Sequence, residues 1–222
     1  MIRGIYILCE GQSEEEFVNA ILRPYFLRFK IYDVRPILMP TSKLQKGGDV
    51  KFDRLKHNVE ILLKREKDII VTSFIDFFKL KTDFPLYNES LTIADKISRV
   101  QFLENAMKNT IDNDRFIPYI QLHEFEGLLF ASNKGFNSLP DLTTKSREVL
   151  NEATIEKDNP ELLNDGFETA PSKRLEKLIP GFDKNKPFYG GIIAEENGIE
   201  IVLKRCKRFN LWIESLTEKF KI

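Results

Sequence analysis

The sequence has only two cysteines and no net charge, and each of these features excludes certain classes of protein. Cys9 and Cys206 are its only cysteines, which excludes a dense disulfide framework and C-x-x-C metal ligands. We therefore expect a reducing compartment, the cytoplasm. The 34 basic and 34 acidic side chains cancel. Zero net charge argues against coating nucleic acid by bulk attraction, although it leaves room for a local basic groove.

Long apolar runs and the common nucleotide-binding motifs are also missing. No run approaches the roughly 18–20 residues that span a bilayer. The apolar start of the chain is too short for a signal peptide and passes directly into Glu10. We therefore expect no membrane partner. Neither a Walker A motif nor G-x-G-x-x-G occurs, so nucleotide binding of those two kinds is unsupported.

Apolar runs alternate with amphipathic stretches over the first 130 residues, and this order predicts the fold. Residues 5–9, 33–38, 68–76 and 115–122 are the predicted strands. Amphipathic helices are predicted between them, and residues 123–130 begin either a helix or a turn. Strands that alternate with helices predict an α/β fold with a mostly parallel sheet flanked by helices.

The ends of the predicted elements add detail. Ser13 and Glu16 fit a capping box that begins the first helix, and Pro24 marks its end or a kink. We place the α/β core in residues 1–131. Residues 132–222 form a helical extension packed on this core as one compact unit. The acid-rich stretch 148–168 is predicted to be a solvated face.

Four carboxylates follow the predicted strands directly. Glu10 follows the first strand, Asp76 ends the third, and Glu124 and Glu126 follow the fourth. Since ligands bind beyond the carboxyl ends of parallel strands, these acids are expected at one edge. Carboxylate oxygens suit Mg²⁺ or Mn²⁺, which can activate water or polarise a phosphoryl oxygen. The alternative is that the acids only cap helix N-termini.

Several motifs resemble known families. The opening Cys9-Glu10-Gly11-Gln12-Ser13-Glu14 resembles the Glu-Gly-x-[Ser/Thr]-[Glu/Asp] start of Toprim-like domains. Such domains occur in topoisomerases, primases and overcoming-lysogenization-defect nucleases. Further motifs follow in order along the chain: Lys46-Gly47-Gly48, Ile75-Asp76-Phe77-Phe78, Asp83-Phe84-Pro85, His123-Glu124-Phe125-Glu126-Gly127-Leu128-Leu129-Phe130, Glu168-Thr169-Ala170-Pro171-Ser172-Lys173-Arg174-Leu175 and Cys206-Lys207-Arg208-Phe209-Asn210-Leu211-Trp212. On these motifs the sequence is identified as a member of the DUF4276 family, bacterial proteins of unknown function that resemble Toprim.

The resemblance implies a Toprim-like core, Mg²⁺ and specific roles for individual residues. Glu10 matches the Toprim glutamate, and Asp76 matches the first acid of its Asp-x-Asp motif. Position 78 is Phe, so the second acid is missing. Asp83, Glu124 or Glu126 would have to supply that oxygen. If residues 124–126 are extended, both glutamates face one side; if helical, they lie roughly 200° apart.

Basic residues and a histidine accompany the acids. His123 is a candidate general base, a residue that orients the carboxylates, or a half-buried imidazole without chemistry. Lys173 and Arg174 follow Pro171 at a predicted helix start, which would attract phosphate or simply lie at the surface. Lys46 and Gly47 belong to a basic loop that either touches phosphate or only connects two elements.

The C-terminal segment 204–212 carries four cations and two aromatic residues. It fits a helix packed on the core better than a site for nucleic-acid backbone with a stacked base.

Together these features predict an Mg²⁺- or Mn²⁺-dependent nuclease or phosphodiesterase that acts on nucleic acid. The resemblance adds a role in bacterial phage defence and a partner ATPase on another chain. The alternative is a non-catalytic nucleic-acid-binding or regulatory subunit of that ATPase, because the second acid is missing. A nucleotidyl-transfer role would need a triphosphate pocket, for which the sequence has no motif.

Overall fold

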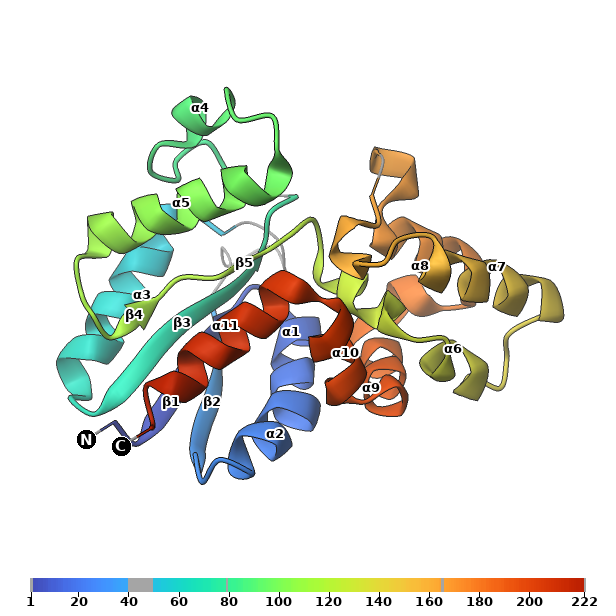
Figure 1. Cartoon of the computed structure of the whole chain (residues 1–222), viewed down its shortest axis with the longest axis horizontal. Coiled ribbons are helices and arrows are strands. Elements are labelled where there is room, and N and C mark those ends of the chain that lie inside the picture. Colours follow the sequence, from blue (N-terminus) through green and yellow to red (C-terminus); the bar gives the residue numbers. More distant parts are fainter. Residues whose placement is uncertain (1, 40–49, 79, 165, 222) are drawn as a thin grey trace.

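The computed structural model describes residues 2–39, 50–78, 80–164 and 166–221, and it shows a parallel sheet with helices on both faces (Figure 1). The strand order is β2-β1-β3-β4 with parallel pairing throughout, and β5 pairs with the end of β3. The predicted α/β fold with a mostly parallel sheet is therefore confirmed. The strands are β1 (Gly4–Cys9), β2 (Asp33–Leu38), β3 (Ile69–Asp76), β4 (Phe116–Ile117) and β5 (Ile120–Gln121).

The side chains of β1 alternate between two hydrophobic clusters, because successive residues of a strand point to opposite faces. Ile5 and Ile7 join a cluster with the first helical segment and the C-terminal helix. Tyr6 and Leu8 join a second cluster on the opposite face. A strand in a parallel sheet that is covered on both faces has a nearly continuous apolar sequence, and β1 and β3 have such sequences.

Each face has its own helices. The second cluster contains residues of α3 and α5, where Leu55, Val59 and Leu63 recur at helical spacing. The other face is covered by α1, α2 and the C-terminal helix α11 (Figure 1). The helices of the first half are α1 (Gln12–Phe17), the π-helical turn η1 (Val18–Leu22), α2 (Arg23–Leu27), α3 (Phe52–Arg65), α4 (Tyr87–Ser90) and α5 (Lys96–Ile111).

The first helix differs from its prediction at both ends. Its N-cap is Gly11, whose N–H donates to Glu14 Oε2 at 2.9 Å, so the predicted box of Ser13 and Glu16 is wrong. At the other end, Pro24 does not end the helical segment, so of the two predicted alternatives, an end or a kink, the end is wrong. It lies in the first turn of α2, after the π-helical turn η1. Proline lacks an N–H, and a wider turn accommodates the missing hydrogen bond.

The predicted strand 115–122 is interrupted. Pro118 separates β4 from β5, because proline cannot donate to a strand ladder. After β5, His123 adopts φ = 65° and turns the chain into the 3₁₀ helix η2, in which all seven residues are buried. This turn places Glu124 and Glu126 beside the end of β3.

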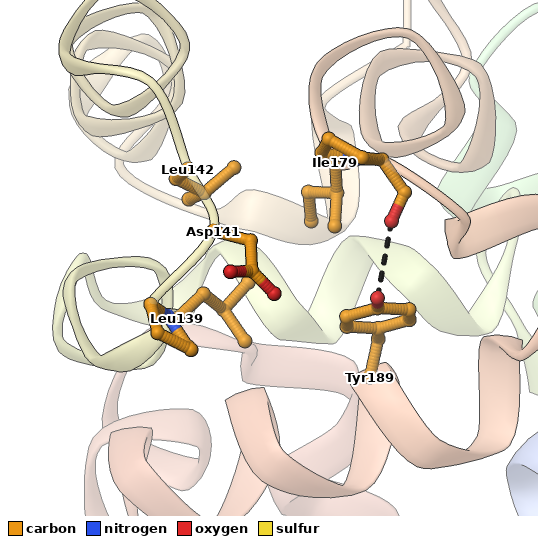
Figure 2. Close-up of a pocket in the computed structure, with 7 residues that line it drawn as sticks. Leu139, Asp141, Leu142, Ile179 and Tyr189 are labelled. Atoms are coloured by element: carbon orange, nitrogen blue, oxygen red, sulfur yellow. Dashed lines mark hydrogen bonds between the residues drawn. The ribbon is translucent and has the colours of Figure 1, made fainter.

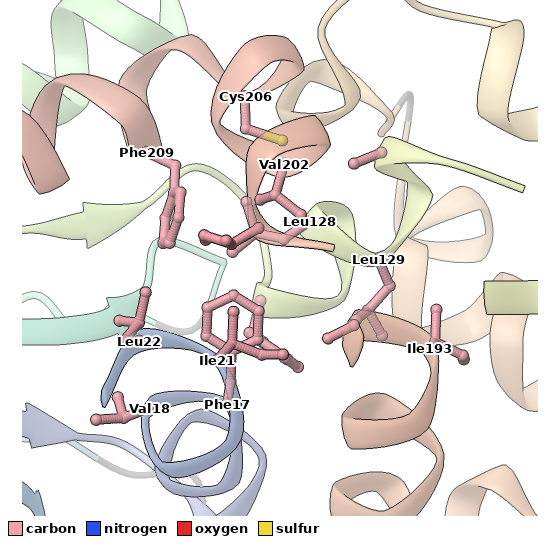
Figure 3. Close-up of a cluster of buried hydrophobic side chains, with 14 of the residues drawn as sticks. Phe17, Val18, Ile21, Leu22, Leu128, Leu129, Ile193, Val202, Cys206 and Phe209 are labelled. Atoms are coloured by element: carbon pink, nitrogen blue, oxygen red, sulfur yellow. The ribbon is translucent and has the colours of Figure 1, made fainter. Parts of the chain in front are cut away.

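The second half of the chain is helical and packs on η2 and α1. Figure 3 shows Phe17 of α1, Leu129 of η2 and Ile193 of α9 in one buried cluster. The elements are η2 (Phe125–Ala131), α6 (Lys134–Ser138), α7 (Thr144–Ile155), η3 (Pro160–Leu162), η4 (Phe167–Thr169), α8 (Pro171–Leu178), η5 (Phe182–Lys184), α9 (Lys186–Asn197), α10 (Ile199–Arg205) and α11 (Lys207–Glu218). Among the described residues, no helix combines the length and apolar character that a membrane crossing requires.

The structure changes one prediction about the surface of this half and agrees with another. Glu161, within the acid-rich stretch, is 1% exposed and accepts hydrogen bonds from the N–H groups of Arg208 and Phe209 at the start of α11. It is therefore a buried cap and not part of a solvated face. Phe209 and Trp212 are buried against β3, where Trp212 Nε1 donates to Thr72 Oγ1. The packing role predicted for this segment is the one observed, and neither ring offers a face to a base.

Candidate active site

The carboxyl ends of the strands are joined by hydrogen bonds that involve acidic side chains. The N–H of Asp76, at the end of β3, donates to Glu10 Oε2 at 3.1 Å. The N–H of Phe125 in turn donates to Asp76 Oδ1 at 2.8 Å. Three separate segments of the chain, which follow β1, β3 and β5, therefore meet through Glu10 and Asp76.

Glu14 is a further acid of this group, and sequence reasoning assigned it no role. Its side chain is 6% exposed and accepts from the N–H of Gly11. Burial and then the charge of Glu10 raise its pKa to about 8. Its place at the acidic position of the Glu10-Gly11-Gln12-Ser13-Glu14 motif was the signal that could have found it.

Glu124 and Glu126 complete the group, and a turn lets both reach it. Glu124 is extended, with φ = −139° and ψ = 153°, and η2 begins at the next residue. The segment is thus neither a plain strand nor a helix. Glu124 Oε2 accepts from the N–H of Ser172 at 3.0 Å, and Glu126 Oε1 lies 3.5 Å from Lys186 Nζ.

The pKa values show that these five acids share one electrostatic environment. Burial raises the pKa of Asp76 well above its usual range, and the charges of Glu10, Glu14, Glu126 and Glu124 raise it further. Burial also raises the pKa of Glu126, partly offset by Lys186. Burial and mutual repulsion of the carboxylates therefore both favour the protonated form of Asp76 in the absence of a cation.

Lys186, at the start of α9, is the cation closest to this charge in the ion pairs of the described residues. Its Nζ lies 3.5 Å from Glu126 Oε1 and 2.9 Å from Glu176 Oε1. Burial works against its charged form, but Glu126 and then Glu176 hold its pKa above the usual value. Sequence reasoning missed Lys186, because nothing in its local pattern relates it to Glu126, 60 positions earlier.

The predicted phosphate-binding residues are placed differently from one another. Lys173 Nζ pairs with Glu176 at 2.6 Å and so joins the charge network of Lys186. Arg174 forms a two-oxygen contact with Glu156, at 2.6 and 3.2 Å, and faces away from this network. The predicted helix start is present, with Pro171 in the first turn of α8. Its Ser172 N–H is occupied by Glu124. Lys46 and Gly47 lie outside the described residues.

His123 lies at the edge of the acid group and is only 5% exposed. Its Nδ1 lies 3.3 Å from Asn164 Nδ2, and its carbonyl oxygen accepts from the N–H of Phe78. The positive φ of a non-glycine residue is a strained conformation that the surrounding contacts must hold. The geometry thus ties the loop after β3 to the loop after β5.

Asp83 does not supply the missing second acid. It is exposed and accepts from the N–H of Phe52 at 3.0 Å, at the start of α3. Of the three residues expected to replace that acid, only Glu124 and Glu126 lie among the acids that act on Asp76, and Glu14 adds a third.

The donor set has the chemistry of a site for a hard divalent cation, since carboxylate oxygens are the ligands Mg²⁺ and Mn²⁺ prefer. In the part of the chain that the structure describes, no three His, Cys, Asp or Glu side chains are already arranged around one ligand position. The carboxylates would therefore have to rotate toward the ion on binding.

A small cavity in the helical half is separate from these acids. Leu139, Asp141, Leu142, Ile179 and Tyr189 line it, and the Tyr189 hydroxyl donates to the Pro180 carbonyl at 3.0 Å (Figure 2). Its volume of about 20 Å³ holds one water molecule at most. It is too small for a substrate.

Comparisons with known proteins agree with this fold. The sequence matches the profile of a family described as a domain of unknown function, DUF4276, over residues 9–217. The structure is similar to the C-terminal region of the Burkholderia pseudomallei OLD protein, with a TM-score of 0.56 and 14% identity over 100% of both chains. It is also similar to the C-terminal region of the Xanthomonas campestris pv. campestris OLD protein, with a TM-score of 0.50 and 15% identity over 99% of this chain and 95% of that one. The comparison with curated proteins finds no match.

Proposed function

The chain belongs to the DUF4276 family, and we propose that it is a nuclease or phosphodiesterase that acts on nucleic acid with Mg²⁺ or Mn²⁺. Two observations support the proposal. The fold is that of the C-terminal region of OLD proteins, with the mostly parallel, Toprim-like sheet. Hydrogen bonds link Glu10, Asp76 and the segment that carries Glu124 and Glu126 at the carboxyl edge of that sheet.

In this proposal the acids hold the metal. Glu10 and Asp76 are the central ligands, and Glu14, Glu124 and Glu126 supply the oxygens that the missing second acid would have given. A divalent cation held there would polarise a phosphoryl oxygen of the substrate and activate a water molecule.

The protein's own cations and hydrogen bonds do the remaining work. Lys186 offsets the negative charge of Glu126 through their ion pair. Lys173 neutralises the substrate phosphate beside the acids. Arg174 is a second phosphate contact, farther from the acids. His123 orients the loop that carries Glu124 and takes the role of general base only if its imidazole reaches the attacking water.

The observation that carries the proposal is the hydrogen bond between the Asp76 N–H and Glu10 Oε2. It joins the side chain of Glu10, at the end of one strand, to the backbone at the end of the adjacent strand. An acid that merely capped its own helix would have no reason to bind the neighbouring strand end. This contact therefore favours a shared site over the capping alternative.

The test is metal-dependent cleavage of DNA and RNA by the wild type, Glu10→Gln and Asp76→Asn. We expect cleavage with Mg²⁺ or Mn²⁺ in the wild type and a loss of about 100-fold or more in each variant. Glu152→Gln, an exposed change on α7, is the matched control. Cleavage at the wild-type rate by either variant, with the same metal, removes that residue from the site.

A non-catalytic role is the second candidate, and Phe78 favours it. Phe78 occupies the position of the second acid, and its side chain cannot bind a metal. In that case the chain is a nucleic-acid-binding or regulatory subunit. We also propose a partner ATPase on another chain, a role in phage defence and a cytoplasmic location. Co-purification of an ATPase with the full-length chain tests the partner.

A further inference from the structure

A second pocket opens beside the acid group, at the two loops that leave it. Phe77 and Phe78 follow Asp76 directly, and His123 precedes Glu124 directly. These residues line a pocket of about 270 Å³. Its other lining residues are Tyr87, Lys96, Arg99, Asn164 and Gly166. Among all the residues that line the pocket, only His123 has a role in the proposed reaction.

The walls of this pocket combine aromatic rings with positive charge. Phe78 is 38% exposed, an unusual position for a phenylalanine next to a strand of the core. The Arg99 guanidinium lies 5.1 Å from the ring centre of Phe77 and 5.3 Å from that of Tyr87. Its Nε donates to Ser90 Oγ at 3.1 Å. Arg99 is thus held in one orientation before any ligand arrives.

The two cations of the pocket form no ion pair with the residues that the structure describes. Within residues 2–39, 50–78, 80–164 and 166–221, neither Lys96 nor Arg99 has a carboxylate at ion-pair distance. The contrast with Arg174 and Lys173, which are both paired with glutamates, is direct. A pocket with stacking surfaces and two such cations suits a ligand that has both a flat ring and a negative charge.

The polar wall adds groups that can bind the edge of such a ring. Asn164 is 7% exposed, and its Oδ1 accepts from the N–H of Gly166 while its Nδ2 lies beside His123. The amide and the imidazole therefore stand fixed at one side of the pocket. A nucleobase presents hydrogen-bonding groups at its edge and an aromatic face, which matches this wall and the rings opposite.

We infer that this pocket binds one unstacked nucleotide, with its base against Phe78 and its phosphate at Lys96 and Arg99, so that the substrate of the neighbouring site is single-stranded nucleic acid. The inference rests on the proposed function for its second half. A base inside a duplex is stacked on both faces and cannot enter a pocket without leaving the helix. Because the pocket and the acids share two loops, a base bound here delivers the adjoining phosphodiester to the acids.

The experiment measures binding separately from cleavage. The probes are a labelled 12-nucleotide oligothymidylate and a labelled 12-base-pair duplex, and fluorescence anisotropy in Mn²⁺ measures their binding. The parent protein is Asp76→Asn, and Phe78→Ala or Lys96→Met is added to it. We expect single-strand binding about tenfold tighter than duplex binding. Phe78→Ala and Lys96→Met should each weaken single-strand binding severalfold and leave duplex binding unchanged.

Matched controls separate the pocket from the general surface. Phe29→Ala removes another exposed phenylalanine, and Arg65→Met removes another exposed cation, on elements remote from the pocket. Both should bind like the parent. Lys96 is exposed, so its variant retains the fold even if Phe78→Ala is less stable.

Two results would overturn the inference: equal affinity for single strand and duplex, or equal losses of affinity for both in the variants. Failure of the proposed function gives a different pattern. In that case Asp76→Asn cleaves as the wild type does, or nothing cleaves, while the binding difference at Phe78 is still measured.

Discussion

The backbone N–H of Asp76 donates a 3.1 Å hydrogen bond to the carboxylate of Glu10, across the ends of two adjacent strands. These residues are 66 positions apart in the chain, and two crossovers, from β1 to β2 and from β2 to β3, separate them. The contact fixes the Glu10 side chain over the end of β3. It thereby sets the position around which Glu14, Glu124 and Glu126 gather.

Gly11 leaves room for the carboxylate of Glu14 because glycine has no side chain. A Cβ at position 11 would lie 3.1 Å from Glu14 Oε2. We expect Gly11→Ala to displace the Glu14 carboxylate and to lower metal-dependent cleavage by about tenfold, since small misplacements in a site are costly. Gly191→Ala is the control, because its Cβ would make only an ordinary 3.5 Å contact with Glu16. Equal rates for both variants and the wild type would show that Glu14 has no part in the reaction.

Lys186 is expected to stabilise the fold most when no metal is bound. Lys186→Met leaves Glu126 and Glu176 without their shared cation. The free energy of unfolding should fall by about 1–2 kcal/mol in EDTA, less than for a fully buried pair because the lysine side chain is 32% exposed. Chemical denaturation measures the loss, and Mg²⁺ should reduce it.

The control for that experiment is Lys184→Met, an exposed change on η5. It should unfold like the wild type in both conditions. If Lys186→Met loses the same free energy with and without Mg²⁺, the lysine does not share the charge of the metal site.

Lys173 is expected to contact substrate phosphate. Lys173→Ala should weaken oligonucleotide binding and reduce the slope of log affinity against log salt by about 1. Lys177→Ala, on the exposed side of α8, should leave the slope unchanged. The measurement is a series of binding titrations at different salt concentrations. An unchanged slope for Lys173→Ala would remove it from the phosphate contacts.

Glu161 is expected to serve the fold and not the chemistry. Its carboxylate accepts from the N–H groups of Arg208 and Phe209, at 2.8 and 3.2 Å, where α11 begins. Glu161→Gln should lower the free energy of unfolding by about 1–2 kcal/mol, as loss of a charged helix cap does. Metal binding should be unchanged. A loss of metal affinity with unchanged stability would place Glu161 in the site instead.

The strands were predictable from the sequence because their apolar runs are continuous, and acids mark the ends of several of them; their order in the sheet was not predicted. The run before Glu10 and the run before Asp76 identify β1 and β3, which lie side by side at the centre of the sheet. The parallel arrangement follows from the alternation with helices. The interruption at Pro118 was visible in the sequence, although the prediction ran the strand through it.

The parts of the site that depend on three-dimensional proximity were not predictable in the same way. Lys186 meets Glu126 only because α9 packs on η2 and α1. The buried place of Glu161 depends on the path of α11. The acid-rich composition around it suggested a solvated face, since composition does not say which acid of a stretch faces a helix end. Glu14 was within reach of sequence reasoning, because it fills the acidic position of the motif that begins at Glu10.

Calorimetric titration of Mn²⁺ into the wild type, Glu10→Gln and Asp76→Asn tests the central claim most directly. The account predicts a saturable binding signal in the wild type and a loss of affinity of at least about tenfold in each variant, with all three proteins folded alike by circular dichroism. Equal binding in the three proteins, or none in the folded wild type, would contradict it.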